Sequence, residues 1–176
     1  MKLNSKFNIL NINKGFTLVE LLVVIAILGV LATIGLVTFS SSQMRGRDTE
    51  RKSDLKQIAS ALEIYYNDYG NYPESGANGL IMACPSLPAP AVACSWDSTA
   101  QFTDGKTVYL KTVPKDPSSG LTYFYVALDD DGANQGFRLF AYLENSQDSS
   151  INTEIGQSCG SKTCNFSITS PNDVLD

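Results

Sequence analysis

The chain has 176 residues, with 13 basic and 18 acidic side chains, a net charge of −5 and no histidine. Such a length suits one ordinary domain plus an extended element. An acidic chain argues against electrostatic capture of nucleic acid. No nucleophile elbow, phosphate-binding glycine loop or carboxylate pair is present, so we expect neither an enzyme nor a bound cofactor.

The N-terminal segment is basic and is followed by an apolar run. Residues 1–14 carry Lys2, Lys6 and Lys14 and no acidic residue, whereas residues 21–39 carry no charge. As a helix, this run of 19 residues spans roughly 28 Å, which suits the bilayer core. The lysines predict a cytoplasmic N-terminus and a single membrane pass with the rest of the chain outside.

Glu20 stands directly before the apolar run, where a carboxylate is costly to bury in lipid. One interpretation is an anchor whose acid reaches back to the interface. The surrounding residues favour another, because KGFTLVELL at residues 14–22 closely resembles the prepilin signature of type IV pilins and type II secretion pseudopilins. The resemblance implies that a membrane prepilin peptidase cuts between Gly15 and Phe16 and methylates the new amine of Phe16.

The same resemblance implies how the subunit assembles. Glu20 would neutralise the N-terminal ammonium of a neighbouring copy and so set the register of the filament. The partners would be other copies of the chain and related pilins, and an inner-membrane assembly platform with a cytoplasmic ATPase. Removal of the leader leaves ten basic against 18 acidic residues, a net charge of −8.

The helical pattern continues beyond the apolar run. Apolar residues recur at steps of three and four over residues 55–69, the period of one helix face. Charged residues crowd positions 45–56 and are interpreted as a solvated face. Gly70 can cap the helix and Pro73 cannot continue it, which predicts one helix from Phe16 to about Tyr69.

The remaining residues predict a small sheet. Residues 74–103 show no periodicity and are interpreted as a stapled surface loop, whereas residues 107–113, 121–128 and 136–143 alternate as strands do. An antiparallel meander of these strands would cover the 55–69 stripe. The expected fold is therefore α+β, a long N-terminal helix packed on a small antiparallel head, as in pilins.

Four cysteines follow the apolar run: Cys84, Cys94, Cys159 and Cys164. Their even number and short spacing favour two local disulfides, Cys84 with Cys94 and Cys159 with Cys164, in an oxidising compartment. Free thiols and a four-thiolate zinc site are the alternatives. The usual spacing of zinc ligands is met only by the second pair.

Two further segments resemble the major pseudopilin. VPKDP at residues 113–117 is similar to the turn that precedes its sheet, although Ser118 and Ser119 replace the Trp-Gly that often follows. Residues 129–134 could offer calcium ligands, with Asp129 and Asp131 as candidates, but EF-hand spacing is absent. A plain hairpin turn explains the same residues.

These observations predict four segments: a leader at 1–15, a membrane and filament-core helix at 16–40, its amphipathic continuation at 41–70, and a head at 71–176. The function predicted is a structural subunit of a type IV pilus or a secretion pseudopilus, held in the inner membrane and then in a periplasmic or extracellular filament. The alternative is a binding domain on a simple membrane anchor.

Overall fold

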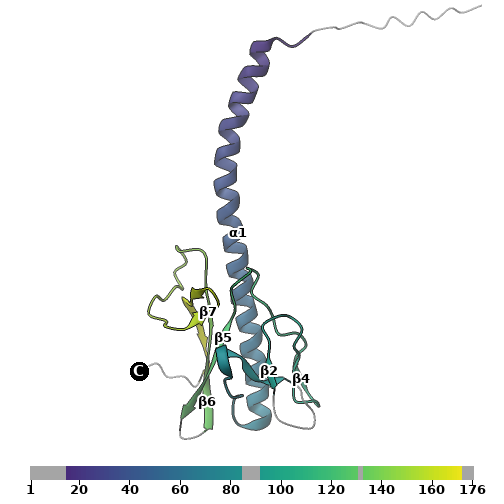
Figure 1. The fold of residues 1–176 in the computed structure, drawn as a ribbon, viewed down its shortest axis with the longest axis vertical. Coiled ribbons are helices and arrows are strands. Elements are labelled where there is room, and N and C mark those ends of the chain that lie inside the picture. The colour runs from purple at the N-terminus through teal and green to yellow at the C-terminus, as the bar shows by residue number, and fades with distance from the viewer. Residues whose placement is uncertain (1–14, 85–91, 131–132, 172–176) are drawn as a thin grey trace, which may run out of the picture. The chain divides into compact units, whose positions relative to one another are not determined.

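The computed structural model describes residues 15–84, 92–130 and 133–171. Its main element is one helix, α1, of 52 residues from Leu18 to Tyr69 (Figure 1). This confirms the predicted continuous helix. The chain forms two compact units, residues 1–40 and 41–176, and α1 contributes to both.

In the second unit, the predicted stripe of α1 supplies one side of the core. Leu55, Ile58 and Leu62 are completely buried, and Tyr65 and Tyr66 pack against them from its edge. The helix ends where Gly70 takes a positive φ of 73° and donates from its N–H to the Tyr66 carbonyl at 2.7 Å. A left-handed residue after the last turn satisfies a terminal carbonyl, which is why glycine stops the helix here.

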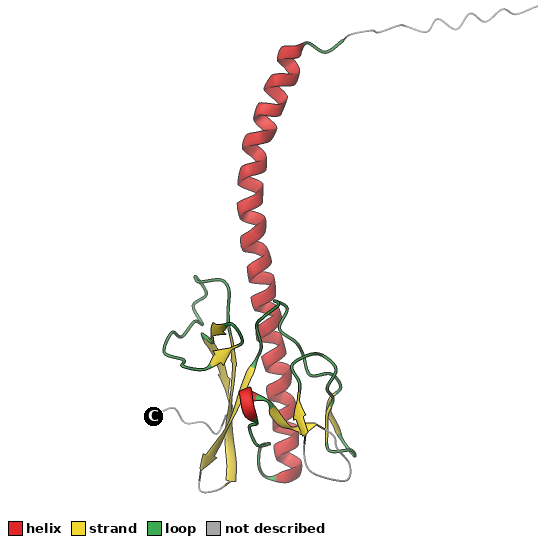
Figure 2. Cartoon of the chain, in the orientation of Figure 1, coloured by secondary structure: helices red, strands yellow, loops and turns green. Residues whose placement is uncertain are grey.

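Short strands make up the rest of this unit, together with the 3-10 turn η1 at Ala77–Gly79 (Figure 2). In chain order the strands are β1 Ile81–Cys84, β2 Val92–Cys94, β3 Phe102–Thr103, β4 Val108–Leu110, β5 Phe124–Asp130, β6 Ala133–Ala141, β7 Ser158–Cys159, β8 Lys162–Thr163 and β9 Phe166–Thr169.

The largest sheet has the order β5-β6-β9, and all its neighbours are antiparallel. Its inner face is formed by residues that alternate along β5 and β6, and it meets the α1 stripe in one shared core. The members of this face are Tyr123, Tyr125, Phe137, Leu139 and Ala141. The expected α+β arrangement, a helix packed with small antiparallel sheets, is therefore present.

Two details of the predicted head are wrong. The third strand of the main sheet is β9 rather than residues 107–113, of which only β4 is a strand, paired with β3. Beyond β4, Val113 donates from its N–H to the Ala100 carbonyl at 2.9 Å, which ties this segment to the residues before β3. Residues 74–103 are also not a plain loop, since they contain β1, β2 and β3. Strands of two to four residues are too short to show alternation in the sequence.

Candidate functional site

The segment before α1 holds the predicted cleavage residues. Gly15, Phe16 and Thr17 precede the helix and are not helical, and the Phe16 side chain is 88% exposed. A Cβ built at Gly15 would meet nothing within 4 Å. The peptide bond between Gly15 and Phe16 therefore lies in exposed, non-helical backbone, the kind of segment a protease can bind.

Thr17 and Glu20 form a reciprocal cap at the start of α1. The Thr17 N–H and hydroxyl both donate to Glu20 Oε2, each at 2.8 Å, and the Glu20 N–H donates to Thr17 Oγ1 at 3.2 Å. This is a capping box, which satisfies two N–H groups that the first turn leaves unpaired. The T-x-x-E spacing at residues 17–20 signals it in the sequence, but our prediction gave Glu20 only a role between subunits.

The helix that follows presents apolar side chains without a covering layer. From Phe16 to Leu31 the large apolar side chains are 48% to 88% exposed, and Phe39 is 63% exposed. A contiguous apolar surface of this size marks an interaction site. Among the described residues, no helix combines the length and hydropathy that define a membrane span.

A buried ion-pair cluster joins α1 to two distant loops of the second unit. Arg51 is completely buried and donates to Asp116 at 2.8 and 2.9 Å, to Asp48 at 2.8 Å, to Glu144 at 2.7 Å and to Ser118 at 2.8 Å. The contact to Asp116 is bidentate, the strongest geometry available to a guanidinium. The expectation of a solvated charged face is therefore wrong at Asp48 and Arg51.

Asp48 also fixes the loop that begins at residue 144. Its two carboxylate oxygens accept the N–H groups of Glu144 and Asn145, at 2.9 and 2.8 Å. Arg47 forms a second ion pair with Glu144 and is the main reason that the pKa of Glu144 falls to about 2. The start of the second unit's helix and this loop are thus held together by charge-assisted bonds.

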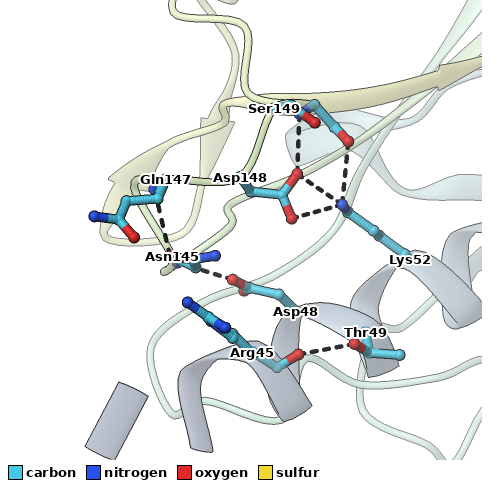
Figure 3. A pocket seen from close by; sticks show the side chains of 9 residues that line it. Arg45, Asp48, Thr49, Lys52, Asn145, Gln147, Asp148 and Ser149 are labelled. Carbon is cyan, nitrogen blue, oxygen red and sulfur yellow. Dashed lines mark hydrogen bonds and ion pairs between the residues drawn. The ribbon is translucent and has the colours of Figure 1, made fainter. Parts of the chain in front are cut away.

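A surface pocket of about 490 Å³ lies between α1 and the same loop (Figure 3). Lys52 forms one wall, where its Nζ donates to Asp148 at 2.7 and 2.8 Å and to Ser150 at 3.1 Å. The hydrogen bond from Lys52 is the main reason that the pKa of Asp148 falls to about 2. Arg45 lies in the opposite part of the lining and extends toward Asn145.

Both local disulfides are present, linking Cys84 with Cys94 and Cys159 with Cys164. The first crosslinks the β1-β2 hairpin. The second closes the small β7-β8 hairpin. This hairpin contacts the turn before β5, where the Ser161 N–H donates to the Gly120 carbonyl at 2.9 Å.

The structure does not describe both calcium candidates, so their distance is unknown. Asp131 lies outside the described residues, and Asp129 pairs with Asn134 through the backbone of β5 and β6. In the described part of the chain, no three His, Cys, Asp or Glu side chains gather as metal ligands would. The plain turn stays our prediction for these residues, with calcium binding as its alternative.

The buried cluster had no local signal in the sequence. Arg51 lies 65 residues from Asp116 and 93 from Glu144. Asp116 belongs to the VPKDP segment, which we interpreted only as a turn. A charged residue within a charged helical segment is normally interpreted as solvent-exposed. Burial can be inferred only when its distant partners are known.

Residues 10–36 match the family model described as the prokaryotic N-terminal methylation motif. Type II secretion system core protein G of Pseudomonas aeruginosa is 36% identical over 115 residues, which are 64% of this chain and 72% of that protein. Core protein G of Vibrio cholerae is 30% identical over 129 residues, 72% of this chain and 80% of that protein.

Type IV major pilin protein PilA of Myxococcus xanthus is 37% identical over 62 residues, 35% of this chain and 28% of that protein. No solved structure matches the chain significantly. The matches to core protein G are longer than the leader and α1 together and so include part of the head. The chain belongs to the family of type IV pilins and type II secretion core proteins and is a structural subunit of a pilus or pseudopilus.

Proposed function

We propose that this subunit is a single-pass inner-membrane precursor that is cleaved between Gly15 and Phe16, methylated on Phe16, and polymerised through the N-terminal part of α1. A prepilin peptidase performs both modifications. An inner-membrane platform driven by a cytoplasmic ATPase then moves the subunit into a periplasmic or extracellular filament of identical and related subunits.

The observation that carries this proposal is the exposed apolar surface of residues 16–31, with Phe39 beyond it. Full burial of one Leu, Ile, Val or Phe side chain contributes about 1.5 to 3 kcal/mol, so a free subunit is strongly driven to cover this surface. Lipid acyl chains would cover it before assembly. Equivalent helices of neighbouring subunits would cover it in the filament.

Glu20 has two roles in this proposal. Within the subunit, its carboxylate caps the first turn of α1 through Thr17. Cleavage after Gly15 removes neither partner, so the cap persists and holds the carboxylate at the helix start. The charge on that carboxylate would then attract the new ammonium of a neighbouring copy, since opposite charges attract strongly where water is excluded.

The N-terminal sequence and mass of the protein from native membranes test the processing step. With the peptidase, we expect chains that begin at N-methylated Phe16; without it, chains that retain Met1. Gly15→Leu should block cleavage because a side chain then occupies the scissile position. Asn13→Leu places the same side chain two residues away and should be processed. Processing of Gly15→Leu, or a cut beyond residue 31, would contradict the proposal.

Two substitutions separate the roles of Glu20. Glu20→Gln keeps an acceptor for the capping box, since Gln is accepted at this position, but removes the charge. Thr17→Ala removes the capping hydroxyl and keeps the charge. We expect Glu20→Gln to lose most filaments and Thr17→Ala to retain them, as counted by electron microscopy. The reverse order would show that Glu20 acts through the cap alone.

A binding domain on a simple anchor is the alternative function. It requires a membrane anchor but neither a cleaved Gly15–Phe16 bond nor a filament. Intact precursor in cells that contain an active prepilin peptidase would favour it.

A further inference from the structure

The two walls of the pocket beside Arg45 differ in whether their charged groups are paired. Lys52, Asp148 and Ser150 bind one another, so this wall is neutral. Arg45 is exposed, and within the described residues no carboxylate lies at ion-pair distance from its guanidinium. The pocket therefore offers an uncompensated cation at its edge.

Asp48 also lines the pocket, but its two oxygens already accept from Arg51 and from the N–H groups of residues 144 and 145. The other lining side chains near Arg45 are neutral donors. Asn145, Gln147 and Ser149 also line the pocket, and each has a side chain that can donate a hydrogen bond. A guanidinium flanked by amides and a hydroxyl suits a carboxylate, which accepts several hydrogen bonds at once. An acidic side chain is thus the chemical group that this pocket fits.

Such a group is found at the other end of the same unit. The Tyr109 hydroxyl lies 2.9 Å from Asp68 Oδ2 and 3.1 Å from Asp104 Oδ2, so two carboxylates share its single proton. A hydrogen bond from Tyr69 to Asp104 at 2.6 Å is the main reason that the pKa of Asp104 lies below its usual range. Asp68 itself is exposed.

Asp68 and Arg45 cannot meet within one chain. They lie 23 residues apart on the same helix, a separation of about 35 Å at about 1.5 Å per residue. We take the helices of the proposed filament to run in the same direction, as equivalent subunits added at one end would. The Asp68 end of one subunit then faces the Arg45 end of another subunit displaced along the axis.

We infer that the pocket at Arg45 receives the acidic end at Asp68 of a second copy of the chain. The inference rests on the proposed function, because it needs parallel subunits. The contact is head-to-tail and does not close on itself, so it can repeat without limit along a filament. The −8 charge of the processed chain makes an unpaired cation at this position notable, because most contacts between acidic heads would be repulsive.

Charge reversal in the full-length chain tests this contact. A single exposed ion pair is weak, but this contact repeats at every subunit. Arg45→Glu should therefore lower the filament fraction pelleted after shearing by at least about threefold. Arg45→Lys should keep most filaments. Lys56→Glu makes the same change of charge on an exposed helix position outside the pocket and should behave as wild type. Adding Asp68→Arg to Arg45→Glu should restore the pelleted fraction.

Photocrosslinking identifies the occupant directly. A benzoylphenylalanine at Thr49, which is exposed and lines the pocket, should crosslink in filaments to the peptide that carries Asp68. Crosslinks to another segment, or filaments unaffected by Arg45→Glu, would overturn this inference and leave the proposed function intact. Absence of filaments from the wild-type chain would overturn both.

Discussion

The two parts of α1 share one backbone conformation and differ in what covers their side chains. Leu28 is 57% exposed and Leu62 is completely buried, although both are leucines within the same helix. The second part packs against the sheet of its own chain, whereas the apolar side chains described in the first part are exposed. The comparison shows that one helical conformation continues along the chain while the layer that covers it changes from one part to the next.

The largest expected effect is in the buried cluster of the second part. Arg51→Ala leaves Asp116 and Asp48 buried without their cation, which should cost about 3 to 5 kcal/mol of unfolding free energy. Urea unfolding of the full chain in detergent, followed by the fluorescence of the buried Trp96, measures it. Lys56→Ala, at an exposed position of the same helix, should stay within about 0.5 kcal/mol. A loss below about 1 kcal/mol for Arg51→Ala would mean that the carboxylates relax toward water.

A matched leucine pair tests the comparison itself. Leu62→Ala should cost about 2 to 5 kcal/mol in the same unfolding assay, because it opens a cavity in the core. Leu28→Ala should leave that unfolding free energy unchanged and instead reduce the number of filaments. Equal effects of the two substitutions on unfolding would contradict the distinction between the two parts.

The Cys159–Cys164 disulfide should contribute less. Replacing both cysteines by serine removes a short loop constraint, for which we expect a loss of about 2 kcal/mol. The same unfolding assay applies without reductant, so that the Cys84–Cys94 disulfide stays intact in both proteins. Ser149→Ala, in an exposed loop, is the control. An unchanged unfolding curve would mean that the β7-β8 hairpin docks equally well without its crosslink.

The smallest effect is acid sensitivity. The pKa values of Glu144 and Asp148 are lowered from 4.5 and 3.8 to about 2 by their hydrogen bonds to Arg47 and Lys52. Their stabilisation is complete above about pH 5 and is lost as the pH falls toward 2, because the unfolded chain takes up protons first. We expect a loss on the order of 1 kcal/mol, since both side chains are partly exposed.

Unfolding free energy measured between pH 6 and pH 2.5 checks this effect. The double variant Glu144→Gln, Asp148→Asn should be less stable at pH 6 and show a shallower decline. A decline as steep as that of the wild type would assign the acid sensitivity to other carboxylates.

Local patterns in the sequence predicted the elements that depend on neighbours along the chain. The α1 stripe, the Gly70 stop and the β5-β6 hairpin follow from periodicity and turn chemistry. The two disulfides follow from short spacing. The KGFTLVELL signature predicted the family, which the relatives confirm.

Long-range pairing could not be predicted in the same way. The place of β9 beside β6 depends on residues 25 or more positions apart, and its four residues show no clear alternation. The burial of Arg51 depends on carboxylates far along the chain, so its own segment resembles a solvated face. The Thr17–Glu20 cap could have been predicted, unlike these long-range contacts. Its T-x-x-E spacing is visible in the sequence, but we did not interpret it as a helix cap.

The Arg51 cluster also orders events during synthesis. Its guanidinium is made early, but Asp116 follows 65 residues later and Glu144 93 residues later. Until Glu144 has emerged, Arg51 lacks one of its anionic partners. Water must then solvate the part of the guanidinium that Glu144 later contacts. A residue made 93 positions later is thus required to complete a cluster at the start of the head, so this cluster cannot be complete before Glu144 has been synthesised.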